Sequence, residues 1–370
     1  MHPKKLIRPL VALALVVSGI SILSLVIANT ENAGNKDFVS YWAAGQLLIR
    51  HSNPYDAAAV LRVEKSVGFQ ESKPLIMRNA PFALVLALPL GLVPAKLGVV
   101  LWSLLLVASI MASVRVLWSI NGRPPDRPHL FGYIFAPTLA CMTLGQTSVF
   151  ALLGLVLFLR FHLTRPVVAG VCIALLAIKP HLVLPLGLVL LLWVQSRRAY
   201  SVLLGAAAGI LCAMIPPIYF DRSVLAHYWP VLTQANAESA RMPNLSAIVR
   251  LGIDPHAAWA QFAPTIVGCL WGIWYFSRNA KEWDWNRHGS LLLLASVWVA
   301  PFSWFTDEII VLPAILAGIS RSENRSLIGF CIINGIALAA VLFGVVVGSG
   351  FYVWTSTAWL FWYLCVVHRR

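Results

Sequence analysis

An aspartate stands at the start of the one long polar stretch in the first half of an otherwise apolar chain. Asp37 is followed by an amphipathic helical pattern, because apolar residues recur at intervals of three to four between Phe38 and Ile49. A carboxylate can accept a proton from an attacking hydroxyl, so Asp37 is a candidate general base. Aspartate is also a favoured helix N-cap residue, and Asp56 precedes a second short helical pattern. Both acids are therefore also open to the interpretation that they only cap helices.

Further polar side chains stand at the ends of apolar segments, at one predicted level of the membrane. Ionisable groups at membrane depth are costly and usually face the protein interior or water, so each is a candidate site residue. Together with Asp37 as the catalytic candidate, the substrate-binding candidates are Tyr41, Tyr55, Arg78, Gln146, Lys179, His181, Arg241, Asn244 and Asp307.

Several of these candidates have a structural alternative. Lys179 and Arg78 could extend to the membrane interface as snorkelling cations. Gln146 could form an interhelical hydrogen bond. The acids at 307–308 could be exposed at a helix start, where the helix dipole favours them. Asn244 opens an Asn-Leu-Ser glycosylation sequence, which matters only in a eukaryotic secretory setting.

The elements that must position these groups are membrane helices. Hydrophobic residues make up 59% of the chain and charged residues 11%, whereas about 25% is charged in a soluble domain. The mean hydropathy of +0.78 also indicates a polytopic membrane protein. The first apolar segment follows basic residues and lacks a clean cleavage site, which predicts a retained signal anchor. We predict spans near 6–28, 97–118, 129–144, 146–160, 166–179, 181–195, 200–220, 257–278, 288–304, 307–320, 325–347 and 352–367.

Basic residues are concentrated in every second loop of the predicted topology. With the N-terminus inside, the short inner loops contain most of the arginines and the short outer turns contain almost none. This positive-inside pattern accounts for most of the net charge of +14, so no nucleic-acid partner is expected. The apolar stretch 81–93 would invert the pattern if it crossed, so we predict that it is re-entrant or interfacial on the outer side. Residues 1–370 then form one integral-membrane domain with outer loops at 29–80 and 221–256.

Motifs of soluble enzyme chemistry are absent from the sequence. There is no Walker A loop, dinucleotide fingerprint, HExxH or GxSxG. The six cysteines lie inside or at the ends of apolar segments, and none has metal-ligand spacing. We therefore expect no cysteine metal site, no disulfide framework and no soluble cofactor, while assistance by a divalent metal ion stays open. A donor that is itself a membrane lipid suits this chain better than a nucleotide.

The order of several motifs resembles glycosyltransferase family 87, a group of membrane proteins with a GT-C fold. The resemblance runs along nearly the whole chain, through Asp37-Phe38 with Tyr41, Pro54-Tyr55-Asp56, Asn79-Ala80-Pro81-Phe82, Gly145-Gln146, Ala177-Ile178-Lys179-Pro180 and Phe305 with Asp307. Two departures occur. Residues 78–80 lack the aromatic residue and the first proline of the family's usual Tyr-Pro-Pro, and Thr147 stands where asparagine is common. These two departures affect the expected geometry of the acceptor site and the identity of the sugar more than the assignment to this class of enzyme.

The resemblance implies an all-α polytopic fold, a GT-C-like bundle of about 10–13 transmembrane helices with a catalytic outer loop after the first helix. It implies transfer of a sugar, mannose in the family's best-known case, from a polyprenyl-phosphate donor to a lipid-linked or glycan acceptor. The reaction would take place on the outer side of a bacterial cytoplasmic membrane, facing the periplasm or exterior. Asp37 would act as the base and invert the linkage. The candidates for the donor phosphate would be Lys179, Arg78, His181 and Arg241.

Two other classes of protein compete with this interpretation. A transporter or lipid flippase of envelope glycan precursors would also need many spans and a polar cavity. No internal repeat relates the two halves of the chain, however, and the two large outer loops break any such symmetry. A non-catalytic partner in envelope assembly is the third possibility. Such a scaffold has no need of Asp37 or Lys179.

Overall fold

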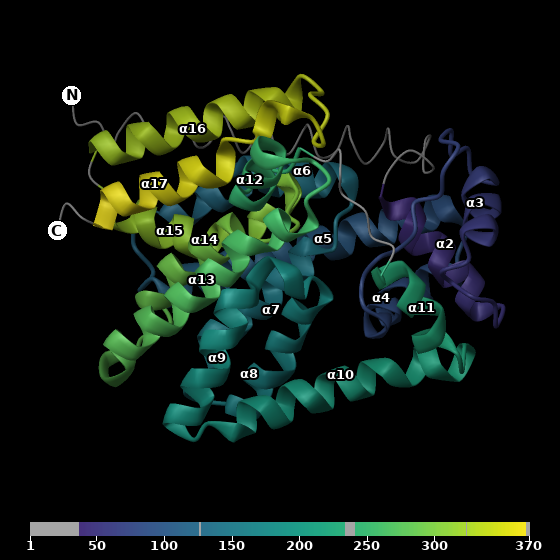
Figure 1. The fold of residues 1–370 in the computed structure, drawn as a ribbon, viewed down its shortest axis with the longest axis horizontal. Coiled ribbons are helices and arrows are strands. Elements are labelled where there is room, and N and C mark those ends of the chain that lie inside the picture. Colours follow the sequence, from purple (N-terminus) through teal and green to yellow (C-terminus); the bar gives the residue numbers. More distant parts are fainter. Residues whose placement is uncertain (1–36, 126, 234–240, 323, 368–370) are drawn as a thin grey trace.

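The described part of the chain is entirely helical (Figure 1). The computed structural model describes residues 37–125, 127–233, 241–322 and 324–367. Within these ranges the regular elements are α-helices and short 3-10 helices, and no strand occurs among them. The all-α polytopic fold class is therefore confirmed. The predicted signal anchor at 6–28 lies outside the described residues.

The helices follow one another without a repeated motif. The first half contains α2 (Phe38–Ile49), α3 (Ala57–Lys65), η2 (Pro81–Ala83), α4 (Leu84–Gly91), α5 (Ala95–Ile120), η3 (Pro128–Tyr133), α6 (Ala136–Leu144), α7 (Ser148–Phe161), α8 (Pro166–Ile173), η4 (Ala174–Ile178), η5 (Pro180–Val183) and α9 (Leu184–Arg197). The second half contains α10 (Tyr200–Phe220), α11 (Val224–Thr233), α12 (Leu245–Ile253), α13 (Ala258–Asn279), η6 (Ala280–Glu282), α14 (His288–Trp298), η7 (Phe305–Val311), α15 (Leu312–Arg321), α16 (Asn324–Leu342), η8 (Gly350–Tyr352) and α17 (Thr355–Val367).

Four helical stretches among the described residues are long and apolar enough to cross a membrane, namely Ala95–Ile120, Pro180–Arg197, Tyr200–Phe220 and Arg325–Leu342. The third, α10, coincides with the predicted span 200–220. It has 21 residues, which gives a length of about 31 Å, close to the thickness of a hydrocarbon core. Leu204 and Leu211 on this helix are each 67% exposed, as expected of side chains that face lipid.

Two other predicted spans change helix type along their length. The segment 166–179 passes from α8 into η4, and the segment 307–320 passes from η7 into α15. Pro180 follows the first segment, and Pro313 lies in the first turn of α15, where a missing backbone donor is tolerated. Hydropathy alone cannot detect such changes. The total number of crossings therefore stays a prediction.

The stretch 81–93 forms only η2 and the short helix α4, which packs across α2. The contact is made backbone to backbone: a Cβ atom on Gly45 would lie 2.2 Å from the carbonyl oxygen of Ala87, and one on Gly91 would meet Gly45 equally closely. Only glycine allows this approach. Residues 81–91 are too few to cross a bilayer, in line with the prediction that this segment packs against protein.

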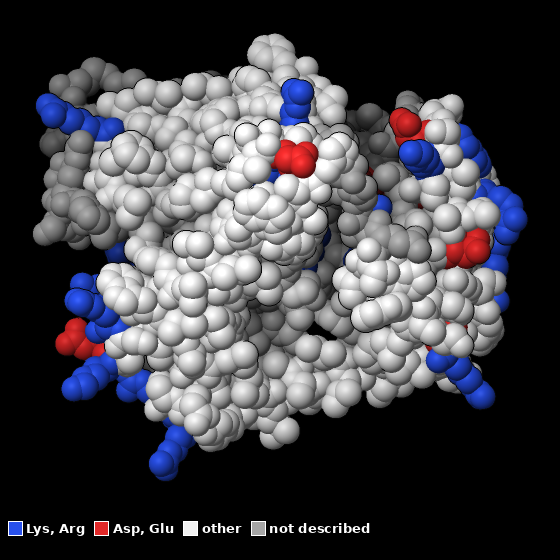
Figure 2. Space-filling model, in the orientation of Figure 1, with Lys and Arg blue, Asp and Glu red and all other residues white. Residues whose placement is uncertain are grey.

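Loops predicted to share a side of the membrane contact each other. The guanidinium of Arg197 donates to the carbonyl of Lys281 at 2.9 Å, which joins two inner loops. At the other end of α10 the hydroxyl of Tyr228 donates to the carbonyl of Arg78 at 3.2 Å, which joins the two outer loops. In Figure 1 α10 runs between these regions. Figure 2 shows Lys and Arg gathered mainly towards the two ends of the visible face, with a broad, almost uncharged surface between them.

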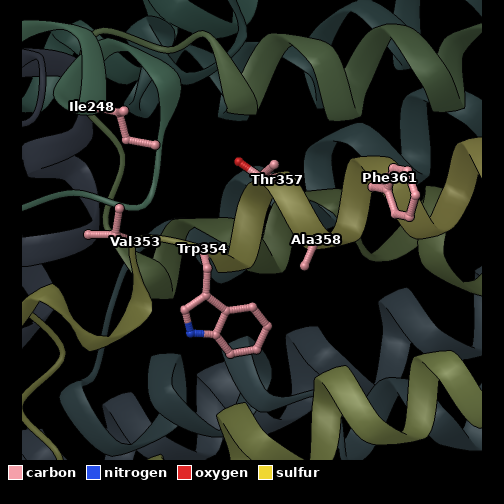
Figure 3. A pocket seen from close by; sticks show the side chains of 6 residues that line it. All are labelled: Ile248, Val353, Trp354, Thr357, Ala358 and Phe361. Carbon is pink, nitrogen blue, oxygen red and sulfur yellow. The ribbon is translucent and has the colours of Figure 1, made fainter. Parts of the chain in front are cut away.

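An apolar groove opens between α12 and α17 (Figure 3). Its volume is about 510 Å³, and it is lined by Ile248, Val353, Trp354, Thr357, Ala358 and Phe361. The α17 residues occupy one face of that helix and the turn before it. The groove is separate from the polar site described next.

Candidate active site

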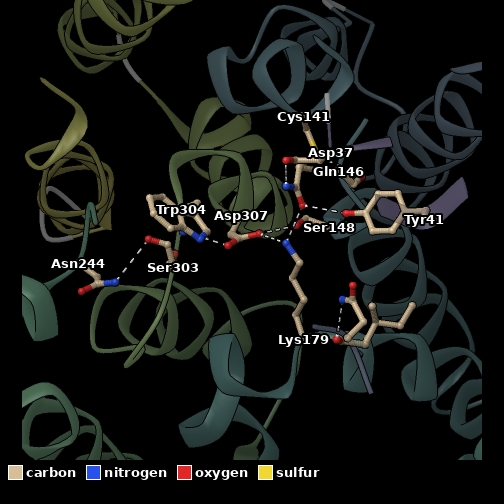
Figure 4. Close-up of polar contacts among 12 residues, drawn as sticks. Asp37, Tyr41, Cys141, Gln146, Ser148, Lys179, Asn244, Ser303, Trp304 and Asp307 are labelled. Carbon is tan, nitrogen blue, oxygen red and sulfur yellow. Dashed lines mark hydrogen bonds and ion pairs between the residues drawn. The ribbon is translucent and has the colours of Figure 1, made fainter. Parts of the chain in front are cut away.

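A continuous chain of polar contacts joins four of the predicted residues, each from a different part of the sequence (Figure 4). The side-chain amide of Gln146 donates to Oδ2 of Asp37. Its carbonyl oxygen accepts a hydrogen bond from Nζ of Lys179 at 2.9 Å. The same Nζ lies 2.6 Å from Oδ1 of Asp307. Fold topology thus brings together Asp37 of the first outer loop and three residues from helix ends.

Asp37 does not cap α2. Its backbone is already helical, with φ −58° and ψ −24°, and its side chain makes no capping hydrogen bond. The cap-only interpretation is therefore wrong. Among the described residues its Oδ1 takes no hydrogen bond, so one carboxylate oxygen is available to a ligand. Burial raises the pKa of Asp37 above its usual value, while the hydrogen bond from Gln146 and the charge of Lys179 lower it. A carboxylate with a raised pKa is a stronger proton acceptor.

A glycine turn directs Gln146 into the site. Gly145 ends α6 in the left-handed conformation with φ +77°. A Cβ atom there would lie 3.3 Å from Nε1 of Trp102, whose N–H donates to the Gly145 carbonyl at 2.7 Å. The two ends of the Gln146 amide are distinguished by charge, because the anion of Asp37 needs a donor and the cation of Lys179 needs an acceptor. Only one orientation of the amide satisfies both.

Proline explains the position of Lys179. Because Pro180 follows, Lys179 adopts a non-helical conformation, with φ −133° and ψ 65°, and separates η4 from η5. The residue is only 9% exposed and is paired with Asp307, so it does not snorkel to the interface. An ammonium group has three N–H donors. Gln146 and Asp307 take two of them, which leaves one for a ligand.

Asp307 is buried rather than an exposed acid at a helix start. It is 1% exposed and accepts hydrogen bonds from Lys179, from the hydroxyl of Ser148 and from the backbone N–H of Trp304. Ser148 was not predicted as a site residue. The signal for it was the polar run Gln146-Thr147-Ser148 between two apolar segments.

Two further predicted residues lie beside the polar chain. The hydroxyl of Tyr41 is 3.5 Å from the side-chain oxygen of Gln146, at the limit of a hydrogen bond. His181 interacts electrostatically with Asp307 and Lys179 and packs edge-on against Phe302 with ring centroids 6.2 Å apart.

Arg78 is held near the site through its neighbour. The side-chain amide of Asn79 donates to the carbonyl of Ile178 at 3.1 Å, immediately before Lys179. The side chain of Arg78 itself is exposed. Asn79 was noted from the sequence only as a departure from the family motif, and the structure gives it a role in joining the first outer loop to the lysine.

The remaining predicted residues lie outside the polar chain. Tyr55 packs against Tyr228 with ring centroids 5.4 Å apart. Asn244 accepts from the backbone N–H of Ala247 at 2.7 Å and so caps α12. It is fully buried, which excludes it as a glycosylation acceptor in the folded chain. Arg241 is exposed and packs beside Gly350.

The arrangement can accept a proton and hold an anion side by side. Asp37 supplies a carboxylate oxygen without a partner among the described residues, and Lys179 supplies an uncommitted N–H. One amide, that of Gln146, contacts both groups and fixes their spacing. Within the described ranges no group of three or more His, Cys, Asp or Glu could hold a metal ion.

The sequence model of glycosyltransferase family 87 matches residues 79–301, more than half of the chain. The match includes Gln146, Lys179 and His181, while Asp37 and Asp307 lie on either side of it. No curated protein and no solved structure matches the chain. The match favours an enzyme over the transporter and scaffold classes, and the apolar helices agree with an integral membrane protein. The chain belongs to glycosyltransferase family 87 and is a membrane glycosyltransferase.

Proposed function

We propose that this enzyme is a GT-C-type glycosyltransferase that moves mannose from a polyprenyl-phosphate donor to a lipid-linked or glycan acceptor. The observation that carries the proposal is the partly buried chain of contacts from Asp37 through Gln146 to Lys179. It pairs a proton acceptor with a cation, which are the two groups that displacement of a phosphate by a hydroxyl requires.

In the proposed reaction Asp37 is the general base. An acceptor hydroxyl hydrogen-bonds to Oδ1 of Asp37 and transfers its proton as its oxygen attacks the anomeric carbon. The new bond joins that carbon to the acceptor oxygen. The bond from the carbon to the phosphate oxygen breaks, and its electron pair leaves on the polyprenyl phosphate. In-line attack inverts a β-linked donor to an α-linked product.

Lys179 is proposed to bind the leaving phosphate. Its third N–H can donate to a phosphate oxygen, and a cation in a buried site stabilises developing negative charge more strongly than one in water. The ion pair with Asp307 fixes the direction of the ammonium group. Gln146 and Asp307 are also candidates to hold sugar hydroxyls. Further candidates for the phosphate are Arg78, His181 and Arg241, and further candidates for the sugar or acceptor are Tyr41 and Tyr55.

The reaction is proposed to take place on the outer side of a bacterial cytoplasmic membrane. Asp37 lies at the start of α2 in the predicted first outer loop, and Arg197 joins two of the predicted inner loops, which are rich in arginine. The prenyl chain of the donor would stay among the membrane-embedded helices. The donor brings its own activated sugar bond, so the proposal requires no soluble cofactor.

The test uses purified protein in liposomes, wild type beside Asp37→Asn. Labelled polyprenyl-phosphate-mannose is supplied with a lipid-glycan acceptor extract, and labelled product is measured without ATP or an ion gradient. We expect product from the wild type alone. Equal turnover by both proteins would refute the base assignment. Failure of the wild type with this donor, together with turnover of another polyprenyl-phosphate sugar, would refute the choice of mannose.

A further inference from the structure

A second acid follows Asp307 in η7 and points to the opposite side. Glu308 is fully buried, and both of its carboxyl oxygens contact α17. Oε1 lies 2.6 Å from the hydroxyl oxygen of Thr355, and Oε2 accepts from the indole N–H of Trp359 at 2.9 Å. None of the Lys, Arg or His residues in the described ranges forms an ion pair with it.

Counting the protons assigns the protonation state of Glu308. The hydroxyl of Thr355 has a single proton, and its oxygen also lies 2.8 Å from the carbonyl oxygen of Tyr352. A carbonyl can only accept, so the hydroxyl proton belongs on that contact. The 2.6 Å contact with Glu308 then needs a proton from the carboxyl group. A neutral carboxyl satisfies these three contacts, can also accept a hydrogen bond from the backbone N–H of Ser356, and avoids burial of an unpaired charge.

The same segment is held by a second contact to the C-terminal region. Phe305 stacks on Tyr352 of η8 with ring centroids 4.2 Å apart and an angle of 22° between the planes. Asp307 therefore lies between two anchors, Phe305 and Glu308. On its other side it binds Lys179.

We propose that Glu308 is kept protonated and acts as a positioning residue that ties α17 to η7 and so holds Asp307 against Lys179. Its effect on catalysis rests on the function proposed above. Its effect on Lys179 does not, because the state of that amine can be measured without any reaction.

The chain offers a matched control on the same helix. Thr357 stands two residues after Thr355, and its hydroxyl accepts from the indole N–H of Trp298 at 2.9 Å. It lines the apolar groove of Figure 3, and Glu308 is not among the lining residues of that groove. Thr355→Val and Thr357→Val each remove one hydroxyl from α17, but only the first removes a contact with Glu308.

The first measurement is the rate at which an amine-acylating reagent labels Lys179. The reconstituted, folded protein is labelled, and the extent of labelling of the peptide that contains Lys179 is then measured by mass spectrometry after digestion. We expect slow labelling in the wild type, in Glu308→Gln and in Thr357→Val. The glutamine amide can donate to Thr355 and accept from Trp359, as a protonated carboxyl does. We expect faster labelling in Thr355→Val and in Glu308→Leu. If Glu308→Leu does not fold, Thr355→Val decides the outcome.

The second measurement is the rate of sugar transfer by the same proteins. We expect kcat to fall about 10- to 100-fold in Thr355→Val and Glu308→Leu, the effect typical of residues that orient a functional side chain. KM should change little. Labelling of Lys179 at the wild-type rate in Thr355→Val would overturn the positioning role, and labelling of Glu308→Gln at the rate of Glu308→Leu would overturn the neutral carboxyl. If the wild type transfers no sugar, the proposed function fails, while the labelling rates still decide this inference.

Discussion

The predicted first outer loop contains two aspartates that stand at the start of a helix, and their side chains have different roles. Asp56 has an extended backbone, with φ −68° and ψ 112°, and its carboxylate accepts from the N–H of Ala59 at 2.6 Å. Asp37 has a helical backbone and makes no such bond. Its carboxylate instead contacts Gln146, far away in the sequence. One acid is satisfied within its own turn and the other by the tertiary fold.

The difference shows how a catalytic acid can be separated from a capping acid. A cap uses its oxygens on the first N–H groups of its helix, which stabilises the helix but leaves little for a ligand. An acid that enters the helical conformation itself cannot make this contact and must find partners elsewhere. At Asp37 these partners belong to a buried charged cluster. An aspartate at the start of a helix can therefore be assigned as a cap or as a site residue only when its backbone angles are known.

The largest effect is expected from paired substitutions of the two aspartates by asparagine. Asp37→Asn should reduce transfer by about 10²- to 10⁴-fold, since an amide cannot accept the acceptor's proton. Asp56→Asn should leave transfer unchanged, because asparagine is an equally good N-cap. Initial rates in liposomes, normalised to folded protein, measure both. Similar losses in the two variants would mean that Asp37 acts only on the structure of the loop.

Replacement of Lys179 tests the other end of the polar chain. Lys179→Met should lower kcat by about 10²- to 10³-fold, the usual cost of losing one group that stabilises transition-state charge. The charge of Lys179 lowers the pKa of Asp37, so its removal should raise that pKa further. The acidic limb of the pH–rate profile should therefore move to higher pH. A profile that stays in place would separate Lys179 from the base.

Lys179→Met also leaves Asp307 as a buried acid without its cation. Loss of one partner from a buried ion pair typically costs about 3–5 kcal/mol. The double variant with Asp307→Asn should recover part of this stability without recovering activity. Thermal unfolding in detergent provides the stability measurement for both proteins.

The sequence predicted the members of the polar chain better than it predicted their context. Gln146, Lys179 and Asp307 were identified because polar groups are rare at the ends of apolar segments, and Asp37 because it opens the long polar stretch before an amphipathic helical pattern. Asn244 was a polar candidate of the loop 221–256 and proved to be a helix cap, since local sequence does not reveal whether a side chain is already satisfied.

Among the helices too, those determined by local sequence were predicted and those determined by tertiary contacts were not. The span 200–220 was predicted to the residue, because an uninterrupted apolar run lies between Arg198 and Asp221. The 3-10 segments at 174–178 and 305–311 were not predicted. Their geometry depends on prolines and on buried partners such as Tyr352, which only the fold brings close.

A third acid of the same loop should give a smaller and pH-dependent effect. Glu64 is buried, both of its oxygens lie 3.2 Å from the backbone nitrogen of Leu75, and burial raises its pKa from 4.5 to about 7. The folded state therefore favours the protonated form of Glu64. The contribution of this group to the free energy of unfolding is fully present below pH 4.5 and decreases as the pH rises toward 7. The change should stay below about 3 kcal/mol, since one pKa unit corresponds to about 1.4 kcal/mol. Glu64→Gln should flatten the dependence of the unfolding temperature on pH, and an unchanged slope would contradict this.

The smallest effect on stability is expected from alanine at the two helix starts, which returns to the comparison of Asp37 with Asp56. Asp56→Ala removes a capping hydrogen bond, which should destabilise the first outer loop by about 1 kcal/mol. The rate of transfer per folded molecule should not change. Asp37→Ala removes no cap, so it should spare the hydrogen-exchange protection of α2 while it abolishes transfer. Exchange measured separately for α2 and α3 distinguishes the two losses. Faster exchange of α2 in Asp37→Ala, equal to that of α3 in Asp56→Ala, would show that the two aspartates share a capping role after all.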